Sequence, residues 1–262
     1  MSSGRKERII MIVEPFNAAF FCLLAAAGLA AGILWALLRR RTEKARRRVL
    51  VAICCCNIVL FFVYKGFLSV DRQFLTLSGI DRFNWWNELP LQLCNINMFL
   101  IPLGVLTKKR PILGFSFFIA PLGALLALLF PELPFRGYPL ALPRMFGFYV
   151  THLTLVVTGL SLAALGFYRP RYRDIPGILG AFVLLVTGAH LLNTVLRLTA
   201  CHYANYFFTY GAAVSALKVM WRLIPVPLLY ELPALVILPV YMALVTALMQ
   251  LGRRKTGAFP GK

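Results

Sequence analysis

The chain has 262 residues, of which 60% are hydrophobic and only 14% charged, and its formal net charge is +19. This composition excludes a water-soluble domain, and the apolar residues form continuous runs rather than the alternating pattern of a transmembrane β-barrel. The basic residues gather at the ends of the apolar runs, which indicates membrane orientation rather than nucleic-acid binding. We therefore predict an all-α, polytopic transmembrane helix bundle that forms a single integral membrane domain over residues 1–262.

Apolar runs long enough to cross a hydrocarbon core of ~30 Å predict about seven membrane-spanning helices. They lie near residues 15–38, 49–69, 87–106, 111–130, 144–167, 175–197 and 228–250. The first run is long and is followed by seven Lys and Arg residues between positions 39 and 48, so we expect a retained helix rather than a cleaved signal peptide.

Two connecting segments, 70–86 and 198–227, are rich in aromatic residues. Because Trp and Tyr favour the membrane–water boundary, we expect both segments to lie at the outer interface, with an extra short span possible in the second. Basic residues are about twice as frequent on the side that carries residues 39–48 as on the other side. The positive-inside rule then predicts an outside amino terminus and a cytoplasmic carboxyl terminus.

Polar side chains inside the predicted spans are few, and each is costly in hydrocarbon unless it has a structural or chemical role. They are Gln92, Cys94, Asn95, Asn97, His152, His190 and Asn193. A rise of ~1.5 Å per residue, counted from the outer end of each span, puts Cys94, His152 and His190 roughly 10–12 Å below the same surface. Three reactive side chains at one depth are compatible with one site.

Cysteine beside histidine is a nucleophile–base pair, because the imidazole takes the thiol proton and produces the reactive thiolate. A nearby amide or backbone N–H would stabilise the oxyanion of an acyl transfer. Each residue also has a structural interpretation, since membrane cysteines often only pack and membrane His and Asn often form interhelical hydrogen bonds. Three alternatives stay open at this point: acyl transfer, transport along a polar path, and lipid binding without turnover.

The six cysteines lack the spacing of metal ligands and do not suggest a disulfide framework. Two or three histidines without carboxylates at the same depth make a poor metal site. We therefore expect no metal and no cofactor.

The stretch Leu89-Pro90-Leu91-Gln92-Leu93-Cys94-Asn95-Ile96 resembles the YwaF family of bacterial integral membrane proteins, which is similar to the transmembrane protein 164 acyltransferase family. Further matching pieces are Gly123-Ala124, Phe130-Pro131, His152 and Asn205-Tyr206. Their order fits over most of the chain, and the segment that ends in Cys94 is the most specific of them. The sequence departs from many relatives at Gln92, where they carry His.

The resemblance implies a multi-pass protein of the bacterial cytoplasmic membrane that acts on membrane phospholipids. In that case Cys94 is the nucleophile and His152 the base, and acyl transfer passes through a thioester. The acceptor is either a lysophospholipid hydroxyl or water, which would make the protein a transferase or a lipid hydrolase. The supporting or substrate-binding residues are then Gln92, Asn95, Asn97, His190, Asn193, Asn205 and Tyr206.

Overall fold

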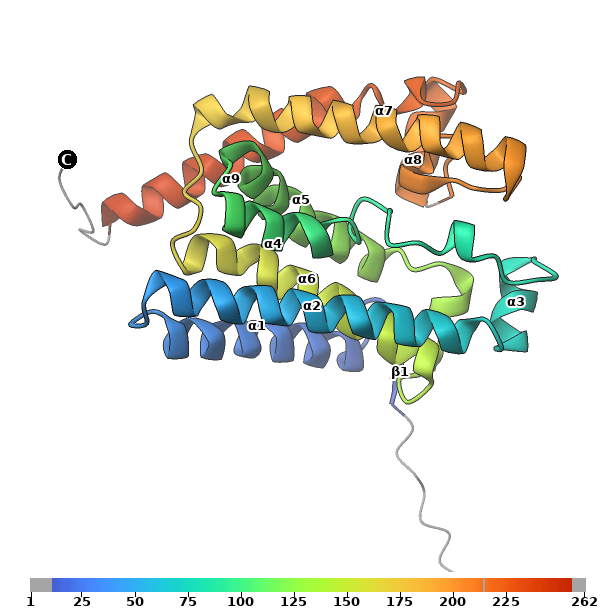
Figure 1. The fold of residues 1–262 in the computed structure, drawn as a ribbon, viewed down its shortest axis with the longest axis horizontal. Coiled ribbons are helices and arrows are strands. Elements are labelled where there is room, and N and C mark those ends of the chain that lie inside the picture. The colour runs from blue at the N-terminus through green and yellow to red at the C-terminus, as the bar shows by residue number, and fades with distance from the viewer. Residues whose placement is uncertain (1–10, 214, 256–262) are drawn as a thin grey trace, which may run out of the picture.

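The computed structural model describes residues 11–213 and 215–255 and is helical almost throughout (Figure 1). The helices are α1 (Ala18–Leu38), α2 (Glu43–Leu68), α3 (Arg72–Ser78), α4 (Asn97–Thr107), α5 (Arg110–Leu129), α6 (Pro143–Ala164), α7 (Ile175–Thr199), α8 (Ser215–Leu223) and α9 (Ala234–Lys255). Short 3-10 turns cover Trp85–Asn87, Leu133–Phe135, Tyr172–Asp174, Tyr206–Phe208 and Leu229–Glu231. Two-residue strands β1 (Ile12–Val13) and β2 (Tyr138–Pro139) pair in antiparallel fashion.

Six helices are long and apolar enough to cross a membrane, namely α1, α2, α5, α6, α7 and α9. This confirms the predicted polytopic helix bundle and makes the chain a multi-pass membrane protein. The shorter apolar helix α4 lies beside α2 and α5 in the place of the predicted third span (Figure 1). The direction in which the bundle crosses the membrane stays a prediction.

Helix α6 lies at the centre of the bundle and packs against α5, α2 and α1, while α7 and α9 cover the side away from α1 (Figure 1). Most of α6 and α5 is buried inside the protein, whereas only a small share of α1, α7 and α9 is buried. Exposed apolar helix surface is what a bilayer-facing helix requires. A side chain on the inner face of α6 is therefore shielded by protein on several sides.

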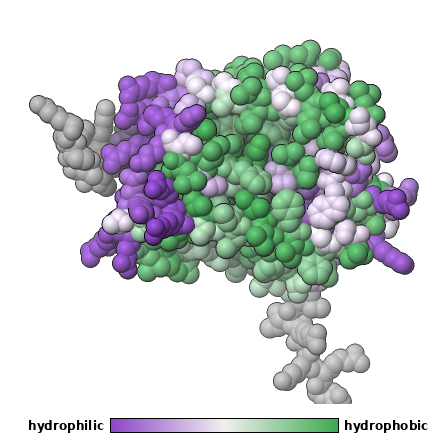
Figure 2. Space-filling view, viewed as in Figure 1, coloured by the Kyte–Doolittle hydropathy of each residue, from purple (hydrophilic) through white to green (hydrophobic). Residues whose placement is uncertain are grey.

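The molecular surface has a broad hydrophobic belt between two more hydrophilic ends (Figure 2). The strongly hydrophilic end corresponds to the turn between α1 and α2, where Arg39, Arg40 and Arg41 are exposed (Figures 1 and 2). The opposite end carries α3, α8 and the β1–β2 pair (Figure 1). Such a belt with polar ends is the surface that a membrane-spanning bundle needs.

The predicted third span differs from the structure in its first half. Residues 88–96 lack regular helix, and α4 begins only at Asn97. Pro90 provides no backbone N–H and disfavours the helical conformation at the residue before it. Gln92 and Leu89 also form hydrogen bonds with the distant segment 205–207 instead of extending the helix. The expected helix over 87–106 was therefore wrong for its amino-terminal half.

The segment predicted at 198–227 contains the turn Tyr206–Phe208 and the nine-residue helix α8, neither of which is long enough to cross a membrane. The last candidate span covers Leu229–Gly252, close to the predicted 228–250, although its first residues form the turn Leu229–Glu231 and α9 itself begins at Ala234. In contrast, α2 begins earlier than predicted. The hydroxyl of Thr42 accepts a hydrogen bond from the N–H of Ala45 (3.3 Å) and so caps a helix that includes the basic residues.

Candidate active site

Cys94 and His152 are in contact although 58 positions separate them in the sequence. The Sγ atom of Cys94 lies 3.5 Å from Nε2 of His152. Cys94 belongs to the turn that leads into α4, and His152 projects from the buried face of α6. His152 is only 4% exposed, whereas Cys94 is partly exposed, so Cys94 is the more accessible residue of the pair.

The imidazole of His152 is oriented by its own helix. Its Nδ1 lies 2.7 Å from the backbone carbonyl oxygen of Phe148. A carbonyl oxygen only accepts hydrogen bonds, so Nδ1 carries the proton and the neutral ring presents the lone pair of Nε2 to Cys94. The ring centroid of Phe148 lies 4.5 Å from that of the imidazole. The Phe148 ring also stacks on the ring of Phe135, with centroids 4.6 Å apart. These contacts fix the ring in the orientation that a general base requires.

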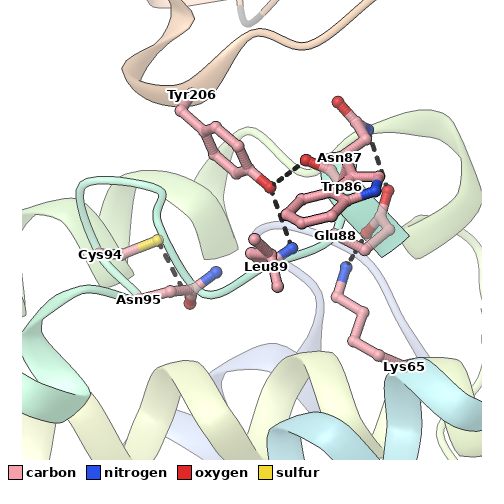
Figure 3. A network of polar contacts seen from close by, with 8 residues as sticks. All are labelled: Lys65, Trp86, Asn87, Glu88, Leu89, Cys94, Asn95 and Tyr206. Carbon is pink, nitrogen blue, oxygen red and sulfur yellow. Dashed lines mark hydrogen bonds and ion pairs between the residues drawn. The ribbon is translucent and has the colours of Figure 1, made fainter. Parts of the chain in front are cut away.

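The thiol of Cys94 has a second acceptor next to it, because Oδ1 of Asn95 lies 3.6 Å from Sγ (Figure 3). The thiol has one proton and donates to Asn95 or His152, one at a time. The backbone N–H groups of Cys94 and Asn95 interact with Sγ. Neither of them donates to a backbone carbonyl within the described residues, which leaves two amide donors beside the reactive atom.

The chain before Cys94 is held by Tyr206. The Tyr206 hydroxyl donates to the carbonyl of Trp86 (2.6 Å) and accepts from the N–H of Leu89 (3.1 Å), as Figure 3 shows. Gln92 forms a second link, since its Nε2 donates to the carbonyl of Asn205 (3.3 Å) and its Oε1 accepts from the N–H of Phe207 (2.9 Å). Both links join the Cys94 loop to the segment that precedes α8.

The segment 205–211 is itself organised by the predicted supporting residues. Asn193 bonds both backbone groups of Tyr206, each at 2.8 Å. The side chain of Asn205 accepts from the N–H of Tyr210 (3.0 Å) and donates to the carbonyl of Gly211 (2.9 Å). These bonds hold a strained backbone, because Phe207 and Phe208 have φ values of 55° and 63°, in the left-handed region.

His190 has a different environment from the one its depth suggested. Its Nδ1 lies 3.2 Å from Oγ1 of Thr209, and its ring stacks on Tyr210 with centroids 4.8 Å apart. The contacts described for His190 thus belong to the 205–211 segment, and Cys94 is not among them. Asn97 is fully buried and donates to the carbonyl of Leu93 (2.8 Å), which supports the turn around Cys94.

A buried ion pair close to the site was not anticipated from the sequence. Lys65, near the end of α2, pairs with Glu88, and Glu88 also accepts a hydrogen bond from the side chain of Asn87 at 3.1 Å (Figure 3). Desolvation raises the pKa of the nearby Glu132, while the charge of Lys65 acts in the opposite direction. The isolated charge of Lys65 in an apolar run, with Glu88 before the Cys94 segment, was the available evidence for a pair.

The sequence model of the TMEM164 family matches residues 10–249. No match was found among curated proteins or among solved structures. The narrower assignment to the YwaF family stays a prediction. Because the match spans most of the chain and includes both Cys94 and His152, the protein belongs to the TMEM164 family.

Proposed function

We propose that this protein is a phospholipid acyltransferase that carries the acyl group on Cys94 as a thioester. The observation that carries the proposal is the 3.5 Å contact between Sγ of Cys94 and Nε2 of His152, with the opposite ring nitrogen bonded to a carbonyl. A thiol next to an oriented imidazole on a partly buried surface is the arrangement required for nucleophilic acyl transfer. By resemblance, we place the protein in the bacterial cytoplasmic membrane with phospholipids as its partners.

In the first half-reaction, Sγ of Cys94 attacks the carbonyl carbon of a phospholipid ester as its proton moves to Nε2 of His152. The tetrahedral intermediate collapses when the carbon–oxygen bond of the ester breaks. The leaving lysophospholipid oxygen takes the proton from Nε2. The acyl group is then joined to Cys94, and His152 is neutral again.

In the second half-reaction, the hydroxyl of a lysophospholipid gives its proton to Nε2 of His152 and attacks the thioester carbon. The carbon–sulfur bond breaks, and the thiol of Cys94 recovers the proton. Water at the same position would give a free fatty acid instead, and the protein would then be a lipid hydrolase. The membrane concentrates the lipid acceptor and the apolar surroundings limit water, which favours transfer.

Each tetrahedral intermediate places a negative charge on the former carbonyl oxygen. The N–H groups of Cys94 and Asn95 are the two donors that support this step, because both belong to the turn at the sulfur and neither donates to a backbone carbonyl in the described chain. Preformed donors of this kind contribute about 3–4 kcal/mol each to transition-state stabilisation in enzymes with oxyanion holes.

A lipid exchange assay tests the proposal. The protein is reconstituted in vesicles with a phosphatidylcholine that carries a deuterated acyl chain and an unlabelled lysophospholipid, and the products are identified by mass spectrometry. We expect the label in the second lipid with wild-type protein and none with Cys94→Ala or His152→Ala. Labelled free fatty acid alone would indicate a hydrolase, and identical lipid profiles for all three proteins would refute the proposed chemistry.

A further inference from the structure

Gly123, in the interior of α5, lies directly against Cys94. A Cβ atom placed on Gly123 would be 3.5 Å from Cβ of Cys94, 3.6 Å from its Cα and 3.7 Å from its backbone nitrogen. These are ordinary van der Waals distances. The position therefore has room for a methyl group, and all three of the nearest atoms belong to Cys94.

Other glycines in the same bundle serve packing. A Cβ on Gly159 would lie 2.8 Å from Cδ of Pro121, and one on Gly147 would collide with the ring of Tyr64. Glycine at those positions is required for helices to approach one another. At Gly123 an alanine would fit, and alanine is the better residue in a helix interior. Packing and helix propensity thus give no reason for glycine at position 123.

The room left by the missing side chain of Gly123 adjoins Cys94, where an ester carbonyl would react. A carbonyl carbon that reacts with Sγ approaches to about 3–3.5 Å and becomes tetrahedral, which requires free volume around the sulfur. The N–H groups of Cys94 and Asn95 donate to no backbone carbonyl in the described residues, so an oxygen bound to the reacting carbon has donors beside Cys94 as well. A methyl group on Gly123 would occupy volume beside the same backbone nitrogen.

We infer that Gly123 forms the wall of the acyl-ester subsite, where the absence of a side chain leaves room for the carbonyl group and the first methylenes of a long-chain acyl group. This inference rests on the proposed function, since it assumes that Cys94 is acylated. In this role Gly123 leaves space for the substrate. Its replacement by alanine should therefore slow acylation while leaving the stability of the protein unchanged or higher.

The test uses Gly123→Ala and Gly123→Val in the full-length protein, reconstituted in phosphatidylcholine nanodiscs. Acylation of Cys94 by p-nitrophenyl hexadecanoate is followed by mass spectrometry of the peptide that contains Cys94. Alkylation of the same residue by iodoacetamide, which has no ester carbonyl at the reacting centre, reports whether the thiol stays accessible. The control is Gly32→Ala, because Gly32 is exposed on α1 and a Cβ there would meet nothing within 4 Å.

For Gly123→Ala we expect acylation to slow by about 10-fold or more, with a larger loss for Gly123→Val. We expect alkylation within about 2-fold of wild type, since removing volume for a carbonyl leaves the sulfur in place. The melting temperature should be unchanged or higher by about 1–3 °C, as for an unstrained glycine-to-alanine change in a helix. Gly32→Ala should leave both reaction rates unchanged.

Equal acylation of wild type and both Gly123 variants would overturn this inference alone and leave the proposed function standing. A large drop in melting temperature for Gly123→Ala would also overturn it, because glycine would then serve packing. If Cys94 in the wild-type protein is alkylated but never acylated, while Cys94→Ala gives the same background, the proposed function fails together with the inference.

Discussion

The side-chain oxygen of Gln92 accepts a hydrogen bond from the backbone N–H of Phe207, at 2.9 Å, while the side-chain nitrogen donates to the carbonyl of Asn205. A single amide thus fastens the loop that carries Cys94 to a segment more than a hundred residues away. Both backbone groups come from the strained segment before α8. In this protein Gln92 has a positioning role that a residue without paired donor and acceptor groups cannot fill.

Replacing Gln92 by Ala should loosen both segments, because it leaves the N–H of Phe207 and the carbonyl of Asn205 without their partner. We expect a loss of about 1–3 kcal/mol in unfolding free energy and faster hydrogen exchange at Phe207. Gln92→Glu keeps the acceptor for Phe207 and loses the donor, so its exchange rate at Phe207 should stay closer to wild type. Equal exchange rates in the two variants would contradict the role assigned to the acceptor.

The hydroxyl of Tyr206 should stabilise the fold by about as much as the side chain of Gln92 does. Tyr206→Phe removes the oxygen that joins Trp86 to Leu89 and leaves two backbone groups unpaired, so we expect a loss of about 1–3 kcal/mol and slower acylation of Cys94. Tyr172→Phe is the matched control, because Tyr172 is exposed and its hydroxyl has no hydrogen-bond partner among the described residues. Thermal unfolding in detergent micelles gives the melting temperature of each variant. Equal melting temperatures for Tyr206→Phe and Tyr172→Phe would contradict the prediction.

The effects of replacing Lys65 and Glu88 on stability should be strongly coupled. Both side chains are mostly buried, at 10% and 12% exposure, so removing one leaves an uncompensated charge in an apolar region. We expect Lys65→Met and Glu88→Gln each to cost about 3–5 kcal/mol in unfolding free energy and the double variant to recover much of that loss. A double-mutant cycle in micelles measures the coupling.

The exposed pair of Lys108 with Glu43 provides the comparison for that cycle. These side chains are 63% and 52% exposed, and Lys108→Met should change the free energy of unfolding by less than about 1 kcal/mol. The prediction is contradicted if the losses of unfolding free energy at Lys65 and Glu88 are additive and as small as the loss at Lys108. The Lys65–Glu88 pair would then behave like an exposed pair.

Hydropathy predicted most of the fold because long helices in a membrane must be continuously apolar, and that property is visible in the chain. It could not predict the break in residues 88–96. Pro90 is compatible with the first turn of a helix as well as with a loop, and the choice depends on contacts of Gln92 and Tyr206 with a distant segment. Helix depth alone predicted that His190 lies level with Cys94. The lateral position of a helix residue depends on packing, however, and in the structure His190 contacts Thr209 and Tyr210.

The pairing of Cys94 with His152 was predictable by a different route. Spacing along the chain gave each residue a depth, but only the family resemblance selected these two from several polar side chains. Gly123 was visible in the sequence as part of a matching dipeptide, yet its contact with Cys94 depends on how α5 packs against the irregular turn before α4. Such a contact between a helix and a loop has no sequence periodicity to reveal it.

Detection of the acyl group on Cys94 tests the central claim most directly. Wild-type protein is incubated with phosphatidylcholine vesicles, quenched in acid, digested and analysed by mass spectrometry, with neutral hydroxylamine used to cleave thioesters. The proposed function predicts a hydroxylamine-sensitive acyl adduct on the peptide containing Cys94, and its absence in His152→Ala and Cys94→Ala. An adduct that forms equally well in His152→Ala, or no adduct on Cys94 under conditions in which acyl exchange proceeds, would contradict it.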